Sequence, residues 1–419
     1  MRRNHNISEK RLLSTGLALS LSALSGAASA GDFKVLHTFK RADGTTSFAG
    51  LYEDAAGDLF GTTLDGGTGG AGTAFELTPD SQGKGYAYTV IFPFTNGPDG
   101  GYPDANFIAD SSGNLYSTTS AGGTGGAGNV FELSMANGQW TETPLYSFTG
   151  GADGGSPYSA LIADQSGNFY GTTYDGGANG YGTVFELSLA NGQWTETVLH
   201  PFAGGNDGAY PIARLMLYKG KLYGTTANGG SGTACDVNCG TVFSLDLSPP
   251  YKETVLYSFT GGSDGDFPEG GLVVNNGYIY STAYGGGNSG CYPGYNCGTV
   301  WRMKPDGTSF SVIHSFTGGS DGGNPDNGLL VGAKGIMYGI SERGGDPGCY
   351  AHAGCGAAFS LTTAGALTPL YDFTGGRDGG NVLGEMIEDK GFILDVAAEG
   401  GSKGCYEQLG CGTVFKVKE

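Results

Sequence analysis

The feature that most constrains this chain is a strand-like segment ending in phenylalanine that recurs seven times. Its copies follow one another at spacings of 55, 54, 54, 57, 57 and 57 residues, and they end at Phe39, Phe94, Phe148, Phe202, Phe259, Phe316 and Phe373. A period near 50 residues made of strands alone predicts a propeller, because each unit is one small sheet that buries its faces only against its neighbours. We therefore expect an all-β chain folded as a seven-bladed β-propeller.

One repeat shows how four strands fit into this period. In the third repeat, strand-like segments run over 158–163, 169–173, 183–187 and 196–202, and we name them strands A, B, C and D. The turn between strands A and B carries a glycine in every copy, as expected where the backbone needs a positive φ: Gly57, Gly113, Gly167, Gly220, Gly277, Gly335 and Gly391. The pattern predicts four-stranded blades.

The two ends of the repeat region predict how the ring closes. The first repeated segment, 35–39, is a D strand, and the last, 413–417, is a C strand. Seven complete blades result only if the N-terminal strand joins the last blade, which removes the exposed edges of an open array. A linear solenoid with capped ends is the alternative.

The first thirty residues are typical of a signal peptide. Basic residues precede an apolar run that begins at Leu12, and the segment ends in Ala28, Ser29 and Ala30. No later stretch has the roughly 20 apolar residues that a transmembrane helix needs. We expect cleavage before Gly31, one propeller domain over 31–419, and an exported protein that is secreted, held at the cell surface or kept in the periplasm.

The net charge of the chain limits the classes of partner that it can bind. Of 21 basic and 40 acidic side chains, four and one respectively lie in the expected signal peptide, so 17 and 39 remain and give a formal charge of −22. Phosphate groups bind to cationic surfaces, so we expect neither nucleic acid nor anionic membrane as a partner. The acidity indicates solubility or an affinity for cations.

All eight cysteines lie in the B–C loops of repeats four to seven. They form four local pairs: Cys235 and Cys239, Cys291 and Cys297, Cys349 and Cys355, and Cys405 and Cys411. In an exported chain such pairs indicate disulfides that hold glycine-rich loops. Zinc is the alternative, but only His352 lies inside one of these loops, so four converging ligands are not offered.

The repeat unit also carries a resemblance to a known family. A dozen or more positions recur in register in units such as LYSFTGGADGGSPYSALIADQSGNFYGTTYDGGANGYGTVFELS, over essentially all of 35–419. This pattern resembles the GloVer (Gloeo/Verruco) tandem-repeat family of exported bacterial proteins of the choice-of-anchor type. The resemblance implies an exported, β-propeller-like surface or secreted protein whose biochemical activity is undefined.

An aspartate followed by glycine is the most regular polar feature, and it lies in the D–A turn of every repeat. The seven residues are Asp43, Asp99, Asp153, Asp207, Asp264, Asp321 and Asp378. Aspartate accepts backbone N–H groups in tight turns, which favours a turn-fixing role. A calcium site is the alternative, since carboxylates suit this cation, but the loops lack the D-x-D-x-D ligand series. We therefore expect no cofactor, with calcium the one candidate.

Residues that differ between repeats are better binding candidates than the repeated ones. In this strand order the D–A turns and B–C loops leave the same face, so side chains near the start of strand A line a shallow funnel there. Aromatic and acidic groups in such a funnel suit a sugar or peptide ligand, and packing of the channel mouth is the alternative. The candidates are Tyr102, Asp104, Tyr158, Tyr210, Arg214, Phe267, Glu269 and Asp326.

Catalytic motifs are sparse. His37, His200 and His314 occupy equivalent D-strand positions, which lie far apart around a ring, so no Ser-His-Asp group is indicated. We expect a monomeric binding module for an extracellular glycan or protein. The alternatives are a structural envelope or matrix protein, and a carbohydrate-active enzyme that uses a pair of carboxylates on the loop face.

Overall fold

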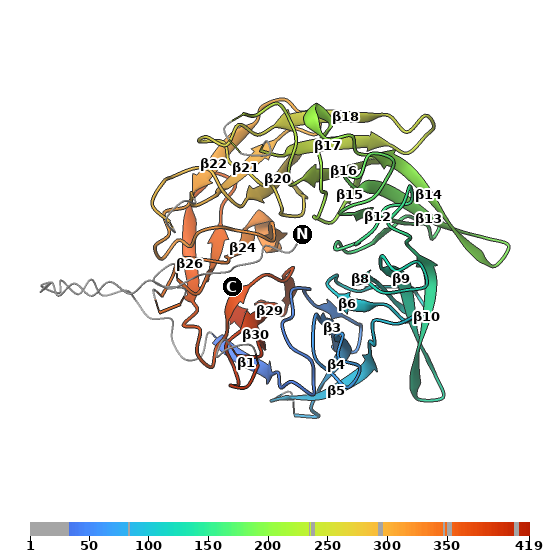
Figure 1. Cartoon of the computed structure of the whole chain (residues 1–419). Helices are drawn as coiled ribbons and strands as arrows, with labels where there is room; N and C mark the ends of the chain where they lie inside the picture. Colours follow the sequence, from blue (N-terminus) through green and yellow to red (C-terminus); the bar gives the residue numbers. More distant parts are fainter. Residues whose placement is uncertain are drawn as a thin grey trace, which may run out of the picture.

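The computed structural model describes residues 33–419 except 83, 234, 236–238, 292–295, 347, 350–353 and 406–409. The expected signal peptide and His352 lie outside the described residues. Seven antiparallel sheets surround a central axis like the blades of a propeller (Figure 1). The described helices are two single 3₁₀ turns, η1 (Gly205–Asp207) and η2 (Ala333–Gly335). The predicted all-β, seven-bladed propeller is confirmed.

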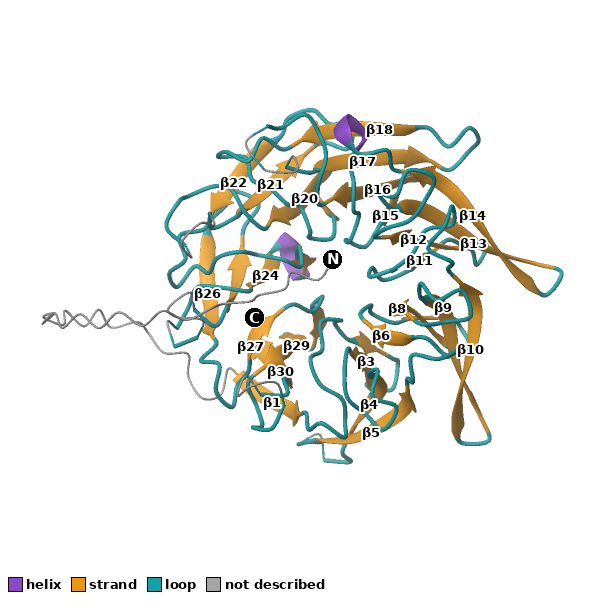
Figure 2. Cartoon of the chain, viewed as in Figure 1, coloured by secondary structure: helices purple, strands orange, loops and turns teal. Residues whose placement is uncertain are grey.

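Blades 1 to 3 follow one another along the first half of the chain. Blade 1 comprises β2 (Tyr52–Glu53), β3 (Leu59–Thr63), β4 (Thr73–Pro79) and β5 (Tyr86–Pro93). Blade 2 comprises β6 (Gly101–Pro103) and β7 (Ile108–Ala109), which share the inner position, then β8 (Leu115–Ala121), β9 (Asn129–Ala136) and β10 (Gln139–Ser147). Blade 3 comprises β11 (Ile162–Ala163), β12 (Phe169–Thr173), β13 (Thr183–Ala190) and β14 (Gln193–Pro201). The outer hairpins β9–β10 and β13–β14 project beyond the ring (Figure 2).

Blades 4 to 7 complete the ring. Blade 4 comprises β15 (Met216–Tyr218), β16 (Lys221–Thr226), β17 (Thr241–Asp246) and β18 (Glu253–Ser258). Blade 5 comprises β19 (Val273–Asn275), β20 (Tyr278–Ala283), β21 (Thr299–Met303) and β22 (Ser311–Ser315). Blade 6 comprises β23 (Leu330–Val331), β24 (Met337–Ser341), β25 (Ala357–Leu361) and β26 (Leu367–Asp372). Blade 7 comprises β27 (Gly380–Val382), β28 (Ile387–Asp389), β29 (Phe392–Glu399), β30 (Thr413–Lys418) and β1 (Phe33–Thr38).

Strand β1 closes the ring. It pairs antiparallel with β30, from Phe33 opposite Val417 to Thr38 opposite Thr413. The N-terminal strand therefore supplies the outer strand of the last blade, as predicted, and β30 has a partner on both sides.

The hydrophobic core lies between neighbouring blades, and the repeated phenylalanine explains it. All seven of these phenylalanines are fully buried. Each packs edge to face against an aromatic ring on strand C of the next blade, as Phe148 does on Phe185 at 5.1 Å between ring centroids. Such pairs contribute about 0.5–1.5 kcal/mol beyond their area. One residue per repeat therefore joins two blades.

The innermost strand is shorter than the sequence predicted. Strand A was expected over 158–163, but β11 covers only Ile162–Ala163. Ser156 has a left-handed backbone with φ of 53°, and Pro157 has no N–H to donate to a ladder. Residues 157–161 therefore lie outside the ladder, and Tyr158, Ser159 and Ala160 line a cavity in the central channel.

Candidate binding face

The D–A turns and B–C loops meet on one face of the ring. In blade 3 the N–H of Gly177 in the B–C loop donates to the carbonyl of Gly151 in the D–A turn at 2.8 Å. The neighbouring Gly176 lies so close that a Cβ on it would be 2.7 Å from Cα of Gly154. The glycine pairs of the repeat are therefore needed for close packing of two backbones.

The repeated aspartates hold the D–A turns. Asp153 Oδ2 accepts the N–H of Thr149 at 2.8 Å and the hydroxyl of Tyr146 at 3.2 Å, and its Oδ1 accepts the Thr149 hydroxyl at 2.5 Å. Five other aspartates of the series also accept the N–H of the residue four positions earlier: Asp99, Asp207, Asp264, Asp321 and Asp378. These contacts are those expected of a turn-fixing residue. Calcium binding by this ring stays the alternative, which no observation here tests.

Three of the predicted binding residues occupy a position with a structural role. Tyr102, Tyr210 and Phe267 have left-handed backbones, with φ of 57°, 57° and 48°. The N–H of Tyr210 donates to the carbonyl of Tyr181 in the preceding blade at 2.9 Å. The same position in every repeat is left-handed and makes this bond to the preceding blade. The backbone there serves the ring, while the side chain can differ from repeat to repeat.

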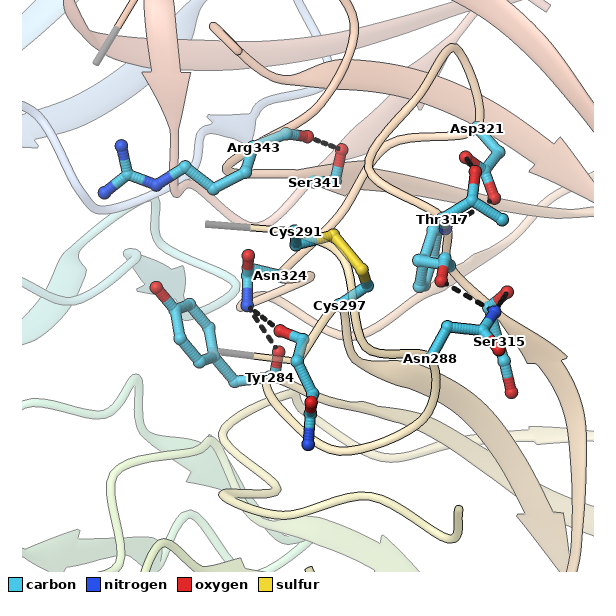
Figure 3. The surroundings of a disulfide bond; sticks show 12 residues. Tyr284, Asn288, Cys291, Cys297, Ser315, Thr317, Asp321, Asn324, Ser341 and Arg343 are labelled. Carbon is cyan, nitrogen blue, oxygen red and sulfur yellow. Dashed lines mark hydrogen bonds between the residues drawn. A yellow bond between two sulfur atoms is a disulfide. The ribbon is translucent and has the colours of Figure 1, made fainter. Parts of the chain in front are cut away.

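The four predicted disulfides are present: Cys235–Cys239, Cys291–Cys297, Cys349–Cys355 and Cys405–Cys411. Their sulfurs bond to each other, so they are not zinc ligands. The carbonyl of Cys297 accepts the N–H of Asn324 at 2.7 Å, which is the bond between blades just described. Around this disulfide, the Asn324 amide donates to the Tyr284 carbonyl and the Asn288 amide to the Ser315 carbonyl, both at 3.0 Å (Figure 3). The disulfides thus lie where the loop face is joined from blade to blade.

Four of the predicted binding residues line one cavity in the central channel. Asp104, Tyr158, Arg214 and Glu269 surround a volume of about 100 Å³. Glu385 was not predicted, yet it reaches the same cavity and pairs with Arg214, Nε to Oε2, at 3.0 Å. Tyr102, Tyr210, Phe267 and Asp326 are not among the described residues that line it.

The Arg214–Glu385 ion pair borders two cavities of the channel. The amide nitrogen of Asn106 lies 3.4 Å from Glu385 Oε2, so three blades meet at this pair. A second cavity of about 390 Å³ is lined by the same three side chains together with Glu53 and Glu388. The pair therefore borders both cavities.

Four tyrosines form a cluster at the channel mouth between blades 3 and 4. Tyr174 stacks on Tyr210 with ring centroids 4.9 Å apart. Tyr158 meets Tyr174 edge to face at 5.5 Å, and Tyr181 meets Tyr210 in the same way at 5.7 Å. Tyr181 is exposed, and the other three are partly buried. We call these four residues the tyrosine cluster; Tyr158 belongs to both the cluster and the channel cavity.

Three notable residues, Tyr174, Tyr181 and Asp395, were not predicted from the sequence. Tyr174 and Tyr181 lie in the B–C loop, away from the start of strand A where the predicted candidates lie.

Asp395 of β29 is fully buried, and burial raises the pKa of its carboxyl well above the usual value. Its repeat position holds glycine or serine in the other blades, for example Gly171 and Ser117. An alignment of the seven repeats would have marked Asp395 as an exception.

The three histidines that the structure describes do not form a catalytic group. His37, His200 and His314 each lie beside the aspartate of their own D–A turn, with nitrogen-to-oxygen distances of 3.4, 3.2 and 3.2 Å. Residues 261–265, 318–322 and 400–404 read G-x-S-x-G, but the first two are D–A turns and the third is a B–C loop, each between two strands. A nucleophile elbow needs a strand-to-helix turn, so these serines lack that context.

The fold and this face define a class: a seven-bladed β-propeller with a loop-face cavity bordered by tyrosines and carboxylates. The family named Gloeobacter/Verrucomicrobia repeat matches residues 83–295, just over half of the chain, and the chain belongs to this family. None of the curated proteins matches the sequence.

Two solved structures are similar to this chain at low sequence identity. An ancestral GH74 enzyme is 12% identical with a TM-score of 0.53, over 90% of this chain and 48% of that enzyme, so the chain spans about half of its length. A gluconolactonase from Xanthomonas campestris is 14% identical with a TM-score of 0.39, over 74% of this chain and 83% of that one. At this identity the likeness concerns the fold alone. Among the described residues, no helix has the length and apolar character to cross a membrane.

Proposed function

We propose that the protein is an exported binding module that holds an extracellular glycan at the tyrosine cluster. The observation that carries this proposal is the position of the cluster, at the channel mouth on the loop face, where the residues that differ between repeats gather. Tyr158 links the cluster to a cavity that also contains Asp104 and Glu269. Aromatic faces and hydrogen-bonding groups are thus side by side.

The chemistry of the cluster suits a sugar. Tyr174 and Tyr210 stack on each other, and the exposed ring of Tyr181 beside them offers flat apolar surface against which the C–H face of a pyranose can pack. Tyrosine hydroxyls and the carboxylates of Asp104 and Glu269 can exchange hydrogen bonds with sugar hydroxyls. A strongly anionic ligand would be repelled by the acidic face. We therefore expect a neutral or cationic glycan.

Export is supported by two independent features. Four disulfides hold loops of the binding face, and disulfides persist in oxidising compartments outside the cytosol. The first thirty residues have the pattern of a signal peptide. The glycan would accordingly belong to the cell surface, the periplasm or the medium.

A glycan array probed with the oxidised chain Gly31–Glu419, in calcium and again in EDTA, tests the proposal. The informative variants exchange cluster residues for those at equivalent positions of other repeats: Tyr174→Ala, as at Ala227, and Tyr210→Asn, as at Asn324. We expect saturable binding that either variant weakens about tenfold or more, equal to roughly 1.4 kcal/mol.

The control is Tyr278→Asn, which removes a tyrosine that begins β20, next to an A–B turn at the other end of the blade. Its binding should equal that of the unchanged chain. Binding that disappears in EDTA would favour the calcium alternative. Absence of any glycan binding, or equal loss in all three variants, would contradict the proposal and favour a protein partner or a structural role.

A further inference from the structure

We infer that the outer rim between blades 3 and 4 contains a binding site for one divalent transition-metal ion such as Zn²⁺, with His200, Asp207 and Glu253 as its ligands. His200 lies in β14, Asp207 in η1 and Glu253 at the start of β18. One ligand atom of each residue lies within 4.8 Å of those of the other two. Segments of two neighbouring blades thus bring one nitrogen and two oxygen donors to one point.

The three donors differ in how they are already held. Asp207 Oδ2 accepts the N–H of Ala203 at 2.6 Å and lies 3.2 Å from His200 Nε2, so its position is fixed by the turn. Glu253 Oε1 is shielded from solvent and has no hydrogen-bond partner among the described residues. A shielded carboxylate oxygen without a partner costs free energy, and a cation at this point would offset that cost. Glu253 is therefore the ligand that gains most from the ion.

The side chains of His200 and Asp207 are 17% and 25% exposed, so an ion can reach them from solvent.

The other interfaces between blades form without the pairing of a histidine and a glutamate, so the fold does not require this pairing. Among the seven described interfaces, only that of blades 3 and 4 has both a histidine two positions before the repeated phenylalanine and a glutamate six positions before the next one. His37 stacks on Tyr88 at 4.0 Å, and the residue placed opposite His314 is Leu367. Two other interfaces have a glutamate with a similarly shielded oxygen, Glu142 or Glu196, but no histidine. The repeated aspartate turn forms in these cases as well.

The donor set selects the class of metal. Imidazole nitrogen and carboxylate oxygen are common zinc ligands, and three protein ligands leave a fourth position for water. Calcium prefers six to eight oxygen ligands, so a site with a histidine differs from the calcium alternative for the aspartate ring. The described structure has no free cysteine, so no thiolate competes for the ion.

Calorimetric titration of the metal-free oxidised chain Gly31–Glu419 with Zn²⁺ tests the inference, with Ca²⁺ and Mg²⁺ titrated in parallel. The first variant, His200→Tyr, removes the nitrogen ligand and keeps the hydrogen bond to the aspartate, because Tyr257 donates to Asp264 at the equivalent position. The second, Glu253→Leu, copies the residue at Leu367. We expect one zinc site in the unchanged chain, at least about tenfold weaker binding in each variant, and a rise in unfolding temperature with zinc only in the unchanged chain.

His314→Tyr is the matched control, since it makes the same change at an interface without a glutamate. It should bind zinc as the unchanged chain does. Circular dichroism of each variant shows whether it has folded, and Glu253→Gln replaces Glu253→Leu if the leucine variant has not. The inference is overturned if the unchanged chain binds no zinc saturably, or if the folded variants at His200 and Glu253 bind zinc as tightly as the unchanged chain.

Discussion

At the scale of residues, one repeat position shows how environment changes chemistry. The residue six positions before the repeated phenylalanine is a glutamate in blades 2 to 4 and an aromatic or leucine elsewhere. Burial raises the pKa of Glu142 to about 8 and that of Glu196 to about 7, and the turn aspartates Asp99 and Asp153 add to these shifts. Each pair of carboxyls lies at the outer rim between two blades.

These shifted acids predict how stability depends on pH. A carboxyl whose pKa is raised in the folded state stabilises the protein fully below its unfolded pKa, about 4.3, and this contribution is lost as the pH rises through the folded pKa. For Glu142 and Glu196 the loss falls between about pH 4.3 and 8. The variant Glu142→Gln/Glu196→Gln should therefore melt at about the same temperature as the unchanged chain at pH 4.5 and at a higher temperature at pH 8.5.

Thermal unfolding followed by circular dichroism at both pH values measures this effect. Glu186→Gln is the control, because it makes the same change on strand β13, where the carboxylate accepts the Tyr170 hydroxyl at 3.1 Å. This control should not raise the melting temperature at pH 8.5. A double variant that melts lower than the unchanged chain at pH 8.5 would show that Glu142 and Glu196 are stabilising as carboxylates.

At the scale of elements, the sequence predicted strands B, C and D because their apolar alternation and bounding glycines are local signals. Strand B of blade 3 matches over 169–173, and strand C begins at Thr183 as expected. Strand A was predicted too long, because the left-handed residue at 156 depends on a bond to the preceding blade. Of the tyrosine cluster, Tyr158 and Tyr210 were predicted and the other two tyrosines were not. The reason is the same, because packing between blades decides which loops meet.

The disulfides also act at the scale of elements, and removing one should lower the free energy of unfolding only slightly. Each closes a loop of only a few residues, with a sequence separation of 6 for Cys291–Cys297. The chain-entropy model gives about 2 kcal/mol for a loop of this size. Ala71 and Ala127 occupy the position of Cys297 in blades without a disulfide and accept the same bond from the next blade. The variant Cys291→Ala/Cys297→Ala should stay folded and lose no more than about 2 kcal/mol of unfolding free energy.

Denaturant unfolding of this variant, beside Cys405→Ala/Cys411→Ala as a second local pair, checks the expectation. Both should keep the β-sheet spectrum of the unchanged chain. Loss of that spectrum in either variant would mean that the disulfides hold the ring together rather than shape its loops.

At the scale of the whole molecule, the common loop face and the central channel depend on closure of the ring. Closure places β1 beside β30, nearly the full chain length away in sequence, and turns seven sequential repeats into one face with a common channel. The channel cavity and the Arg214–Glu385 ion pair draw on blades from across the ring. The period, the seven copies and the matching end strands made this closure predictable. Four of the residues that line the channel were predicted from their place near the start of strand A. The pairing of Arg214 with Glu385 was not predictable, because it depends on the radius and tilt of the finished ring.

The most direct test of this account is lysine cross-linking of the native chain, read by mass spectrometry. Lys34 of β1 lies directly opposite Lys416 of β30, so a short amine-reactive linker should join them within one molecule. A mixture of isotope-labelled and unlabelled chains distinguishes a link within one molecule from a link between two. A closed propeller predicts an abundant Lys34–Lys416 link with no mixed-isotope product. Absence of this link, or its occurrence only between molecules, would contradict the closed ring.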